Sequence, residues 1–277
     1  MAKTIAIVNQ KGGVGKTTTC VNLAAALNEA GQRVLLCDFD PQANATSGMG
    51  VDKNAASPNV YDVLINDADP KKAVVATKYG DVLPSNKALA GAGIEMIGIE
   101  DREKLLKQAL DQLSPSYDYI FIDCPPSLEL LTVNALCAAG SLLVPVQCEY
   151  YALEGLSDLL ATVRIVKRKL NPRLALEGLS DLLATVRLVK RKLNPRLTLE
   201  GVLLTMFDSR TNLSLQVAEE VKRFFPGQVY ATVIPRNVRL SEAPSHGKPV
   251  SAYDPYSRGA EAYAALASEI ASIHSKT

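Results

Sequence analysis

A glycine-rich loop constrains this chain more than any other feature. It reads QKGGVGKTT at residues 10–18, between an apolar run at residues 5–9 and an Ala-rich helical pattern at residues 17–29. In a strand–loop–helix unit, the N–H groups of the loop and of the helix start face the same anion. Glycines also let the backbone turn inward toward phosphate oxygens. The motif therefore predicts a phosphate-binding loop.

The residue types in this loop suit a nucleotide. Lys16 is placed to reach the β- and γ-phosphates, and the Thr17 hydroxyl to ligate Mg²⁺. The usual pattern has a glycine six residues before this lysine, where the chain has Gln10 followed by an additional cation, Lys11. The residues expected to hold the nucleotide here are Lys11, Gly12, Gly13, Val14, Gly15, Lys16, Thr17 and Thr18.

Strand-like and helix-like patterns alternate along the rest of the chain. Strands are expected at residues 5–9, 33–38, 119–123, 141–146, 202–206 and 229–234. Helices are expected at residues 17–29, 102–113, 128–138, 156–170, 213–225 and 258–273, the last after a loop at 249–257. This alternation predicts an α/β fold, a mostly parallel twisted sheet with helices on both faces. With no linker rich in Gly, Pro or Ser, one domain over residues 1–277 is expected.

Composition and cysteine content indicate the cellular compartment and whether the protein is secreted or membrane-bound. The chain has 277 residues and is 47% hydrophobic, enough to bury a full core. Its five cysteines are odd in number and lack CxxC spacing, which favours buried thiols in a reducing compartment over a disulfide framework or a metal site. Neither a secretory signal nor an apolar stretch of membrane-spanning length is recognisable. We expect a cytoplasmic protein without a membrane partner.

Two almost identical segments stand in tandem at residues 152–174 and 175–197. They differ only at Ile165 and Leu188, which indicates a recent duplication rather than a solenoid. Together they carry ten basic and four acidic side chains in a chain of net charge +1. A basic stripe of this kind is typical either of a solvated helix face or of a polyanion-binding surface. We expect one copy to form a crossover helix of the sheet and the other to lie outside the core.

Several motifs together resemble one family. The loop with Lys11 looks like a deviant Walker A motif, DFDPQAN at residues 38–44 like its second motif, and YDYIFIDCPPS at residues 117–127 like a Walker B strand. The segments PVQCEYYALEG at 145–155 and VIPRNVRLSEAPS at 233–245 narrow the resemblance to ParA/Soj-type partition ATPases. It covers nearly the whole chain apart from the additional repeat copy, in the short form without an N-terminal helix-turn-helix domain.

The resemblance implies an enzyme that binds Mg-ATP, hydrolyses it slowly and forms an ATP-bound homodimer. It assigns catalytic roles to Lys11, Lys16 and Asp40: Lys11 contacts the partner's nucleotide, and Asp40 positions the attacking water. Gly12 permits close approach of the two chains. Asp123, at the C-terminal end of an apolar strand, suits a water-mediated contact to the Mg²⁺ that Thr17 ligates. The alternatives are a helix or turn cap for Asp40 and a capping role for Asp123 at the edge of the core.

The resemblance also implies which residues border the adenine base and which partners the protein binds. Met206 and the three residues Pro235, Arg236 and Asn237 are expected to border the adenine. Residues 86–89 (NKAL) lack the final Asp of a guanine motif, which favours ATP over GTP. Arg210 and Arg239 are expected to bind DNA nonspecifically on the nucleoid, with a ParB-like centromere-binding partner that stimulates turnover. The alternative is that these arginines only pair with acids such as Asp208 and Glu242.

Other functions remain open at this point. A MinD-like cell-division ATPase shares the loop, but it would carry a basic amphipathic tail, whereas residues 260–275 are small and include two glutamates. Nitrogenase iron-protein-like reductases also share the loop, but the cysteines here do not follow their cluster motifs. An interpretation of a different class is a DNA-binding regulator that uses ATP only as a switch.

Overall fold

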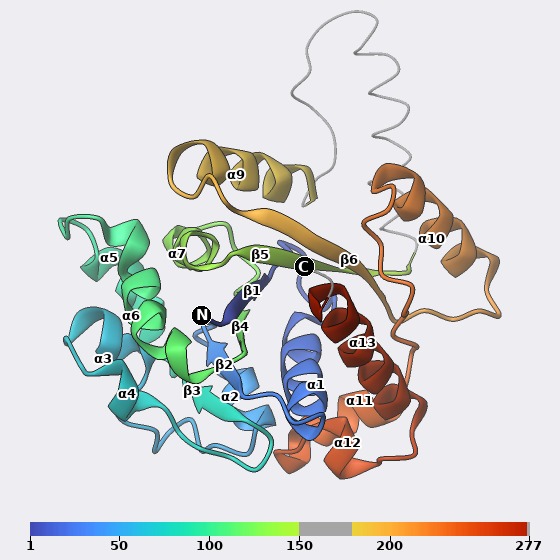
Figure 1. Ribbon diagram of the computed structural model, residues 1–277, viewed down its shortest axis with the longest axis horizontal. Coiled ribbons are helices and arrows are strands. Elements are labelled where there is room, and N and C mark those ends of the chain that lie inside the picture. The colour runs from blue at the N-terminus through green and yellow to red at the C-terminus, as the bar shows by residue number, and fades with distance from the viewer. Residues whose placement is uncertain (150–178, 276–277) are drawn as a thin grey trace, which may run out of the picture.

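One six-stranded sheet organises the molecule (Figure 1). The computed structural model describes residues 1–149 and 179–275. Its strands are β1 (Lys3–Ile7), β2 (Val34–Asp38), β3 (Asp81–Leu83), β4 (Tyr119–Asp123), β5 (Ser141–Gln147) and β6 (Thr198–Thr205). They lie in the order β3-β2-β4-β1-β5-β6, and every neighbouring pair is parallel. The predicted α/β class with a parallel sheet is confirmed.

Helices cover both faces of the sheet. They are α1 (Lys16–Glu29), α2 (Asn44–Gly48), α3 (Val60–Ile65), α4 (Pro70–Ala73), α5 (Leu89–Glu95), α6 (Leu105–Leu113), α7 (Leu130–Ala138), α9 (Leu179–Lys192), α10 (Asn212–Phe224), α11 (Val238–Glu242), α12 (Val250–Tyr253) and α13 (Arg258–Ser275). Three 3-10 turns are η1 (Arg102–Lys104), η2 (Ser114–Ser116) and η3 (Ala243–His246). Within the described ranges, none of the helices combines the length and apolarity needed to cross a bilayer.

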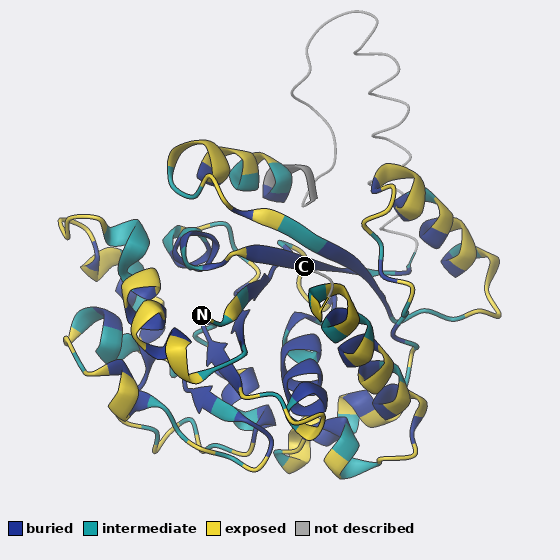
Figure 2. Ribbon diagram, viewed as in Figure 1, coloured by how far each residue is buried: buried dark blue, intermediate teal, exposed yellow. Residues whose placement is uncertain are grey.

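Alternation along the strands divides the core into two layers. In β1, Ile5 and Ile7 belong to the hydrophobic cluster under α1 and α13, while Ala6, and Val8 directly after the strand, belong to the cluster on the opposite face. Successive strand residues point to opposite faces, so a central strand must be apolar on both sides. Figure 2 shows the same division, with the strands buried and the outer sides of the helices exposed.

The expectation of a strand at residues 229–234 is wrong. This segment and β6 share isolated contacts and no continuous ladder: a bridge pairs Val202 with Val229, and the Ile234 amide donates to the Leu204 carbonyl oxygen at 2.8 Å. Between them, the amides of Ala231 and Thr232 donate to the carboxylate of Glu269 on α13, at 2.8 and 2.9 Å. Because that side chain takes amides that a sheet ladder would use, the segment remains a loop.

Other departures involve short elements. The sequence pattern missed β3, which has three residues, and the predicted loop at 249–257 contains the single-turn helix α12. The amide of Val250 at the start of α12 donates to the Asn22 side chain of α1 at 2.6 Å. Elements this short depend on tertiary contacts, because an isolated turn gains too few hydrogen bonds to offset the entropy of ordering it.

The second repeat copy supplies the crossover helix between β5 and β6. Leu182 and Val189 of α9 are buried in the core cluster shared with α7. After α9, the Asn194 side chain donates to the carbonyl oxygens of Leu136 and Ala139 at the end of α7, at 2.9 and 2.8 Å. The first copy, residues 152–174, lies outside the described residues, so its expected place remains a prediction.

Candidate nucleotide-binding site

The glycine-rich loop lies between β1 and α1 at the carboxyl end of the strands. Gly13 and Gly15 have φ values of 75° and 90°, which a residue with a Cβ rarely adopts. Gly15 is also the N-cap of α1, so it turns the chain directly into the helix. The Val14 carbonyl accepts a 2.9 Å hydrogen bond from the Thr205 hydroxyl at the end of β6. The loop is therefore anchored to a neighbouring strand while its amides remain at the start of a helix.

Lys16 crosses the inside of this loop. Its ammonium donates to the Lys11 carbonyl oxygen at 3.1 Å, and the residue is only 7% exposed. Burial lowers the pKa of Lys16, while the negative charge of Asp123 offsets part of that effect. Lys11 is exposed, and its amide donates to the Asn9 side chain at 3.0 Å. The two predicted lysines thus differ in burial: one points into the loop, and the other lies on the surface.

Asp123 lies at the end of β4 next to the loop. It is fully buried, and among the described residues neither of its carboxylate oxygens has a hydrogen-bond partner. Burial, and then the negative charge of Asp38, raise the pKa of Asp123 well above its usual range. The Thr17 hydroxyl lies close enough to lower that pKa in part, although no hydrogen bond of ordinary geometry joins the two groups. The capping alternative for Asp123 finds no support in this geometry.

Asp38 was not among the predicted site residues, yet it faces Asp123 across the β2–β4 register. Its Oδ2 accepts from both the amide and the hydroxyl of Thr46, each at 2.7 Å, and its Oδ1 accepts from the Asp40 amide at 3.2 Å. Burial raises the pKa of Asp38 to about 6. Asp38 therefore holds the loop after β2 in place, a role that its position at the end of an apolar strand could have suggested.

Asp40 follows in that loop and is half-buried. Its Oδ1 accepts from the Gln42 amide at 2.9 Å, and its main-chain oxygen accepts from the Ser85 hydroxyl at 2.9 Å. The turn-capping interaction considered for this residue is present. It uses one carboxylate oxygen, and the water-positioning role of Asp40 remains a prediction.

These residues fit a magnesium ion that arrives with a nucleotide. A buried carboxylate without hydrogen-bond partners is costly unless it binds a cation. No group of three or more His, Cys, Asp or Glu side chains suited to a metal occurs in the described part of the chain. Mg²⁺ usually takes one or two protein ligands and completes its shell with phosphate oxygens and water. Thr17 and Asp123 would supply the protein side of such a site.

A cavity of about 440 Å³ opens beside the loop, and it brings the expected adenine residues together. Met206, Pro235, Arg236 and Asn237 line it with Gly15 and Thr18. The structure adds residues that the sequence interpretation missed: Thr205, Ile234, Leu240, Ser241, Pro244 and Tyr263. Most belong to the segments already noted around 206 and 233–245. Tyr263, from α13, has no local signal, and its hydroxyl lies 3.2 Å from that of Thr19 in α1.

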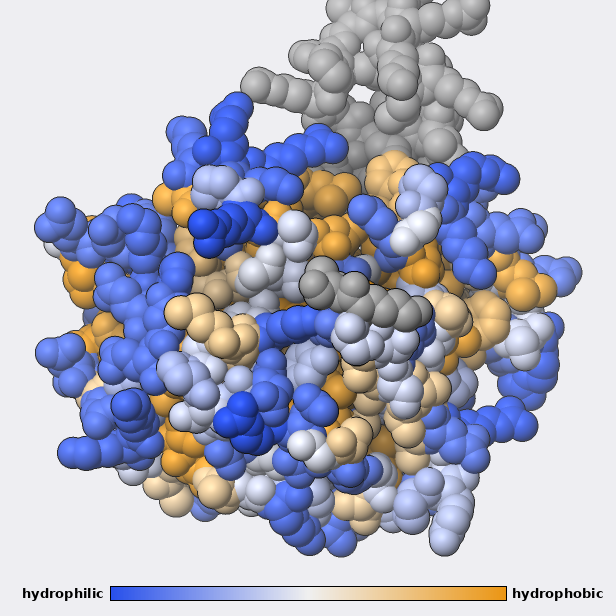
Figure 3. Space-filling model, in the orientation of Figure 1, coloured by the Kyte–Doolittle hydropathy of each residue, from blue (hydrophilic) through white to orange (hydrophobic). Residues whose placement is uncertain are grey.

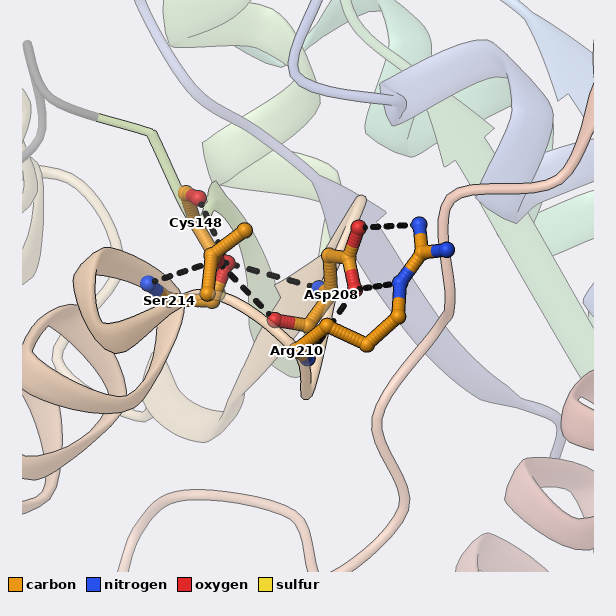
Figure 4. Close-up of polar contacts among 5 residues, drawn as sticks. Cys148, Asp208, Arg210 and Ser214 are labelled. Atoms are coloured by element: carbon orange, nitrogen blue, oxygen red, sulfur yellow. Dashed lines mark hydrogen bonds and ion pairs between the residues drawn. The ribbon is translucent and has the colours of Figure 1, made fainter.

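Both predicted DNA-binding arginines are paired with acids. The guanidinium of Arg210 donates two hydrogen bonds to the carboxylate of Asp208, at 2.9 and 2.7 Å (Figure 4). The Arg210 side chain is nevertheless 87% exposed. This pairing lowers the pKa of Asp208 to about 2. Arg239 contacts Glu242 at 2.8 Å and Asp254 at 3.1 Å. The pairing alternative is therefore observed, and DNA binding by the two arginines remains a prediction.

Comparison with known proteins identifies the family. A family model described as an AAA domain matches residues 2–176. The sporulation initiation inhibitor protein Soj of Bacillus subtilis (strain 168) is 57% identical over 98% of this chain and 99% of its own. A Mycobacterium smegmatis structure described as cobyrinic acid a,c-diamide synthase with bound ATP analog and magnesium has TM-score 0.77 and 37% identity, covering 97% of this chain and 93% of its own.

A more distant neighbour comes from cell division. The Pyrococcus horikoshii septum site-determining protein MinD, complexed with Mg-ADP, has TM-score 0.71 and 26% identity over 98% of this chain and 96% of its own. The identity to Soj is about twice as high over an equal share of the chain, which favours partition over the MinD-like alternative. This chain belongs to the Soj/ParA family of chromosome-partitioning ATPases.

Proposed function

We propose that this chain binds and hydrolyses Mg-ATP and uses the nucleotide to switch between a monomer and a DNA-binding homodimer in chromosome or plasmid partition. One observation carries the proposal. A buried lysine in a glycine-rich loop, a buried carboxylate without partners and a cavity of about 440 Å³ meet at one edge of the sheet. This arrangement suits a phosphate chain, a divalent cation and a base, in that order.

The loop would hold the phosphates by its amides and by Lys16. To do so, Lys16 must exchange the Lys11 carbonyl for a phosphate oxygen, which is a stronger, charge-assisted partner. Bound Mg²⁺ would neutralise phosphate charge and polarise the transferred group. Thr17 and Asp123 would hold that ion, and the charge of Asp123 would then have the cation it lacks in the nucleotide-free chain.

A second copy of the chain would complete the site. Lys11 is exposed at the loop, where it can reach a nucleotide on a partner and neutralise charge that develops on the transferred phosphoryl group. Gly12 supports this arrangement. A Cβ added there would meet nothing within 4 Å, and its φ is not positive, so nothing within one described chain requires glycine at that position. Close approach of a partner would require it.

Hydrolysis needs a water aligned with the γ-phosphate, and Asp40 is the candidate to position it. One carboxylate oxygen is held by the Gln42 amide, so the other has a defined orientation. Hydrogen bonds from Thr46 and Ser85 connect this loop to the body of the protein. A held but half-buried carboxylate suits positioning of water better than strong general-base catalysis.

DNA would bind nonspecifically to the dimer through Arg210 and Arg239. Both guanidinium groups are exposed enough to exchange a surface carboxylate for a phosphate, because exposed ion pairs are weak. Dimerisation would double the number of cations on the surface. A ParB-like centromere-binding protein would be the partner that stimulates turnover.

DNA binding measured with ATP, with ADP and without nucleotide tests the proposal. We expect a dimer mass by light scattering, and a DNA complex stable enough to give an electrophoretic shift, only with Mg-ATP, together with slow phosphate release. The Arg210→Glu/Arg239→Glu variant should lose the ATP-dependent shift but retain nucleotide binding. A protein that shifts DNA with ATP and never releases phosphate would instead be a regulator that uses ATP only as a switch.

A further inference from the structure

Five cations lie exposed on the outer side of α9 and on the turn that follows it. They are Arg187, Lys190, Arg191, Lys192 and Arg196, called here the α9 basic face. Another side of the helix packs into the core through the buried side chains of Leu182 and Val189. Figure 3 shows hydrophilic side chains projecting from the surface over α9, with hydrophobic groups visible between them. The packing of the helix thus leaves its four cations in solvent, and Arg196 on the following turn adds a fifth exposed cation.

These cations differ from the two arginines of the partition site. Arg210 and Arg239 each contact at least one carboxylate, whereas no side chain of the α9 basic face forms an ion pair with any other described residue. An unpaired cation is available to an incoming phosphate without first losing a carboxylate partner. Arg210 and Arg239 must give up such a partner.

The α9 basic face also lies away from the nucleotide. The chain leaves α9 through Asn194, which contacts the end of α7, and enters β6 where Thr198 donates to the Gly140 carbonyl at 3.1 Å. Gly140 directly precedes β5, so this is the amino edge of the sheet. The phosphate loop lies at the opposite, carboxyl edge. Nucleotide binding therefore has no direct contact with the α9 basic face.

Geometry and polarity favour duplex DNA over a membrane surface. Arg187 to Lys192 cover about 8 Å of helix axis, and duplex DNA of that length carries roughly four phosphates. A membrane-binding helix would need an apolar side free for insertion. The apolar side of α9 is used for packing, and among its described side chains only Leu188, at 47%, is a large exposed hydrophobic group.

We propose that the α9 basic face is a second DNA-binding surface, which contacts the phosphate backbone independently of nucleotide and keeps the ADP-bound or nucleotide-free protein weakly associated with DNA. The contact is electrostatic and independent of sequence. It does not depend on the dimer or on ATP, so it stands or falls separately from the partition function proposed above.

Fluorescence anisotropy with a short labelled duplex of arbitrary sequence, in Mg-ADP and over a series of KCl concentrations, tests this surface. The Lys190→Gln/Arg191→Gln/Lys192→Gln variant should weaken binding about tenfold or more and make the salt slope shallower by about 2 to 3, because each phosphate that is no longer neutralised lowers the slope by about 0.9. Arg196→Gln, which lies beyond the helix, should lower the slope by about 1. It tests the same surface even if the triple variant proves unstable.

A matched control removes the same charge elsewhere. Lys71→Gln/Lys72→Gln/Lys87→Gln takes three exposed lysines from around α4 and α5, and it should leave ADP-state DNA binding unchanged. Equal losses in the two triple variants would mean that net charge alone is responsible, and would overturn the proposal. So would unchanged DNA binding by both α9 variants, or binding to anionic phosphatidylglycerol vesicles that the α9 substitutions abolish while DNA binding persists.

Discussion

The ends of β2 and β4 carry two carboxylates that are neighbours in register and fully buried, but they are bonded differently. Asp38 accepts three hydrogen bonds, from Thr46 and from the amide of Asp40. Asp123 accepts none from any residue that the structure describes. A satisfied buried carboxylate organises the protein around it, whereas an unsatisfied one is explained by a ligand that arrives later. The difference separates the structural role of Asp38 from the binding role proposed for Asp123.

The largest effect should come from the lysine beside Asp123. We expect Lys16→Ala to abolish nucleotide binding, because the substitution removes the loop cation that is buried next to the predicted phosphate position. Lys11→Ala, the matched change in the same loop, should retain binding and lose ATP-dependent dimerisation. Titration of a fluorescent ATP analogue and light scattering measure the two outcomes. A Lys11→Ala protein that still dimerises with ATP would remove its role across the interface.

Asp40→Ala should have the next largest effect, on turnover alone. The change leaves Asp38 and Asp123 in place, so we expect Mg-ATP binding to persist while hydrolysis falls by about 100-fold, an amount typical of losing one group that stabilises or positions in the transition state. The protein should then accumulate as an ATP-bound dimer. Steady-state phosphate release with ATP is the measurement, and undiminished release would show that Asp40 acts only as a turn cap.

The buried carboxylates should make stability depend on pH in an unusual direction. Burial raises the pKa of Asp38 to about 6, so the folded state holds a proton more tightly than the unfolded state does. The free energy of unfolding should therefore fall as pH rises from about 4 to about 6, by roughly 3 kcal/mol if Asp38 alone dominated. Urea denaturation across this range tests the sign, and adding Mg-ATP should reduce the loss by supplying a cation to Asp123.

Substitution by Asn should affect the two carboxylates in opposite ways. Asp38→Asn puts an NH₂ donor where a carboxylate oxygen now accepts hydrogen bonds from the amide and hydroxyl of Thr46 or the amide of Asp40. Two donors would then face each other, which should lower the free energy of unfolding by about 1–3 kcal/mol. Asp123→Asn removes a buried carboxyl group that accepts no hydrogen bond from any described residue, so the nucleotide-free protein should be at least as stable as the original chain. The same substitution should abolish the stabilisation that Mg²⁺ adds to bound ATP. Thermal melts of both variants, with and without Mg-ATP, measure these effects. Equal changes in Tm for Asp38→Asn and Asp123→Asn would contradict the difference proposed between the two carboxylates.

Deleting one repeat copy should have the smallest effect on the nucleotide site at the strand ends. Removal of 152–174 or of 175–197 leaves chains that differ at a single position, Ile or Leu, so both should fold alike. Because the connection between β5 and β6 needs only one helix, we expect unchanged ATP binding and improved solubility or thermal stability. Unfolding of both deletion variants would show that the two copies are part of one core.

Much of the site could be located before the fold was known, because its signals are local. The loop at 10–18 and Asp123 at the end of an apolar strand each lie within one strand-to-helix unit. The segment 229–234 looked like a strand for equally local reasons, and that prediction failed. Its amides are taken by Glu269, more than thirty residues away, and no local pattern contains that information. The same limit explains why Tyr263 was missed in the cavity.

The order of residues along the chain was enough to predict the parallel sheet, the phosphate loop and the family. Periodicity and the succession of strand, glycines and helix are properties of neighbouring residues. The folded molecule alone shows which carboxylate is satisfied, which arginines are paired and which face of α9 meets water. Those outcomes depend on partners from other elements: Thr46 of α2 contacts Asp38 at the end of β2, Asp254 contacts Arg239, and α7 covers Leu182 and Val189. Burial and charge pairing are set by what the fold brings into contact, so chemistry that depends on them appears only when the chain is folded.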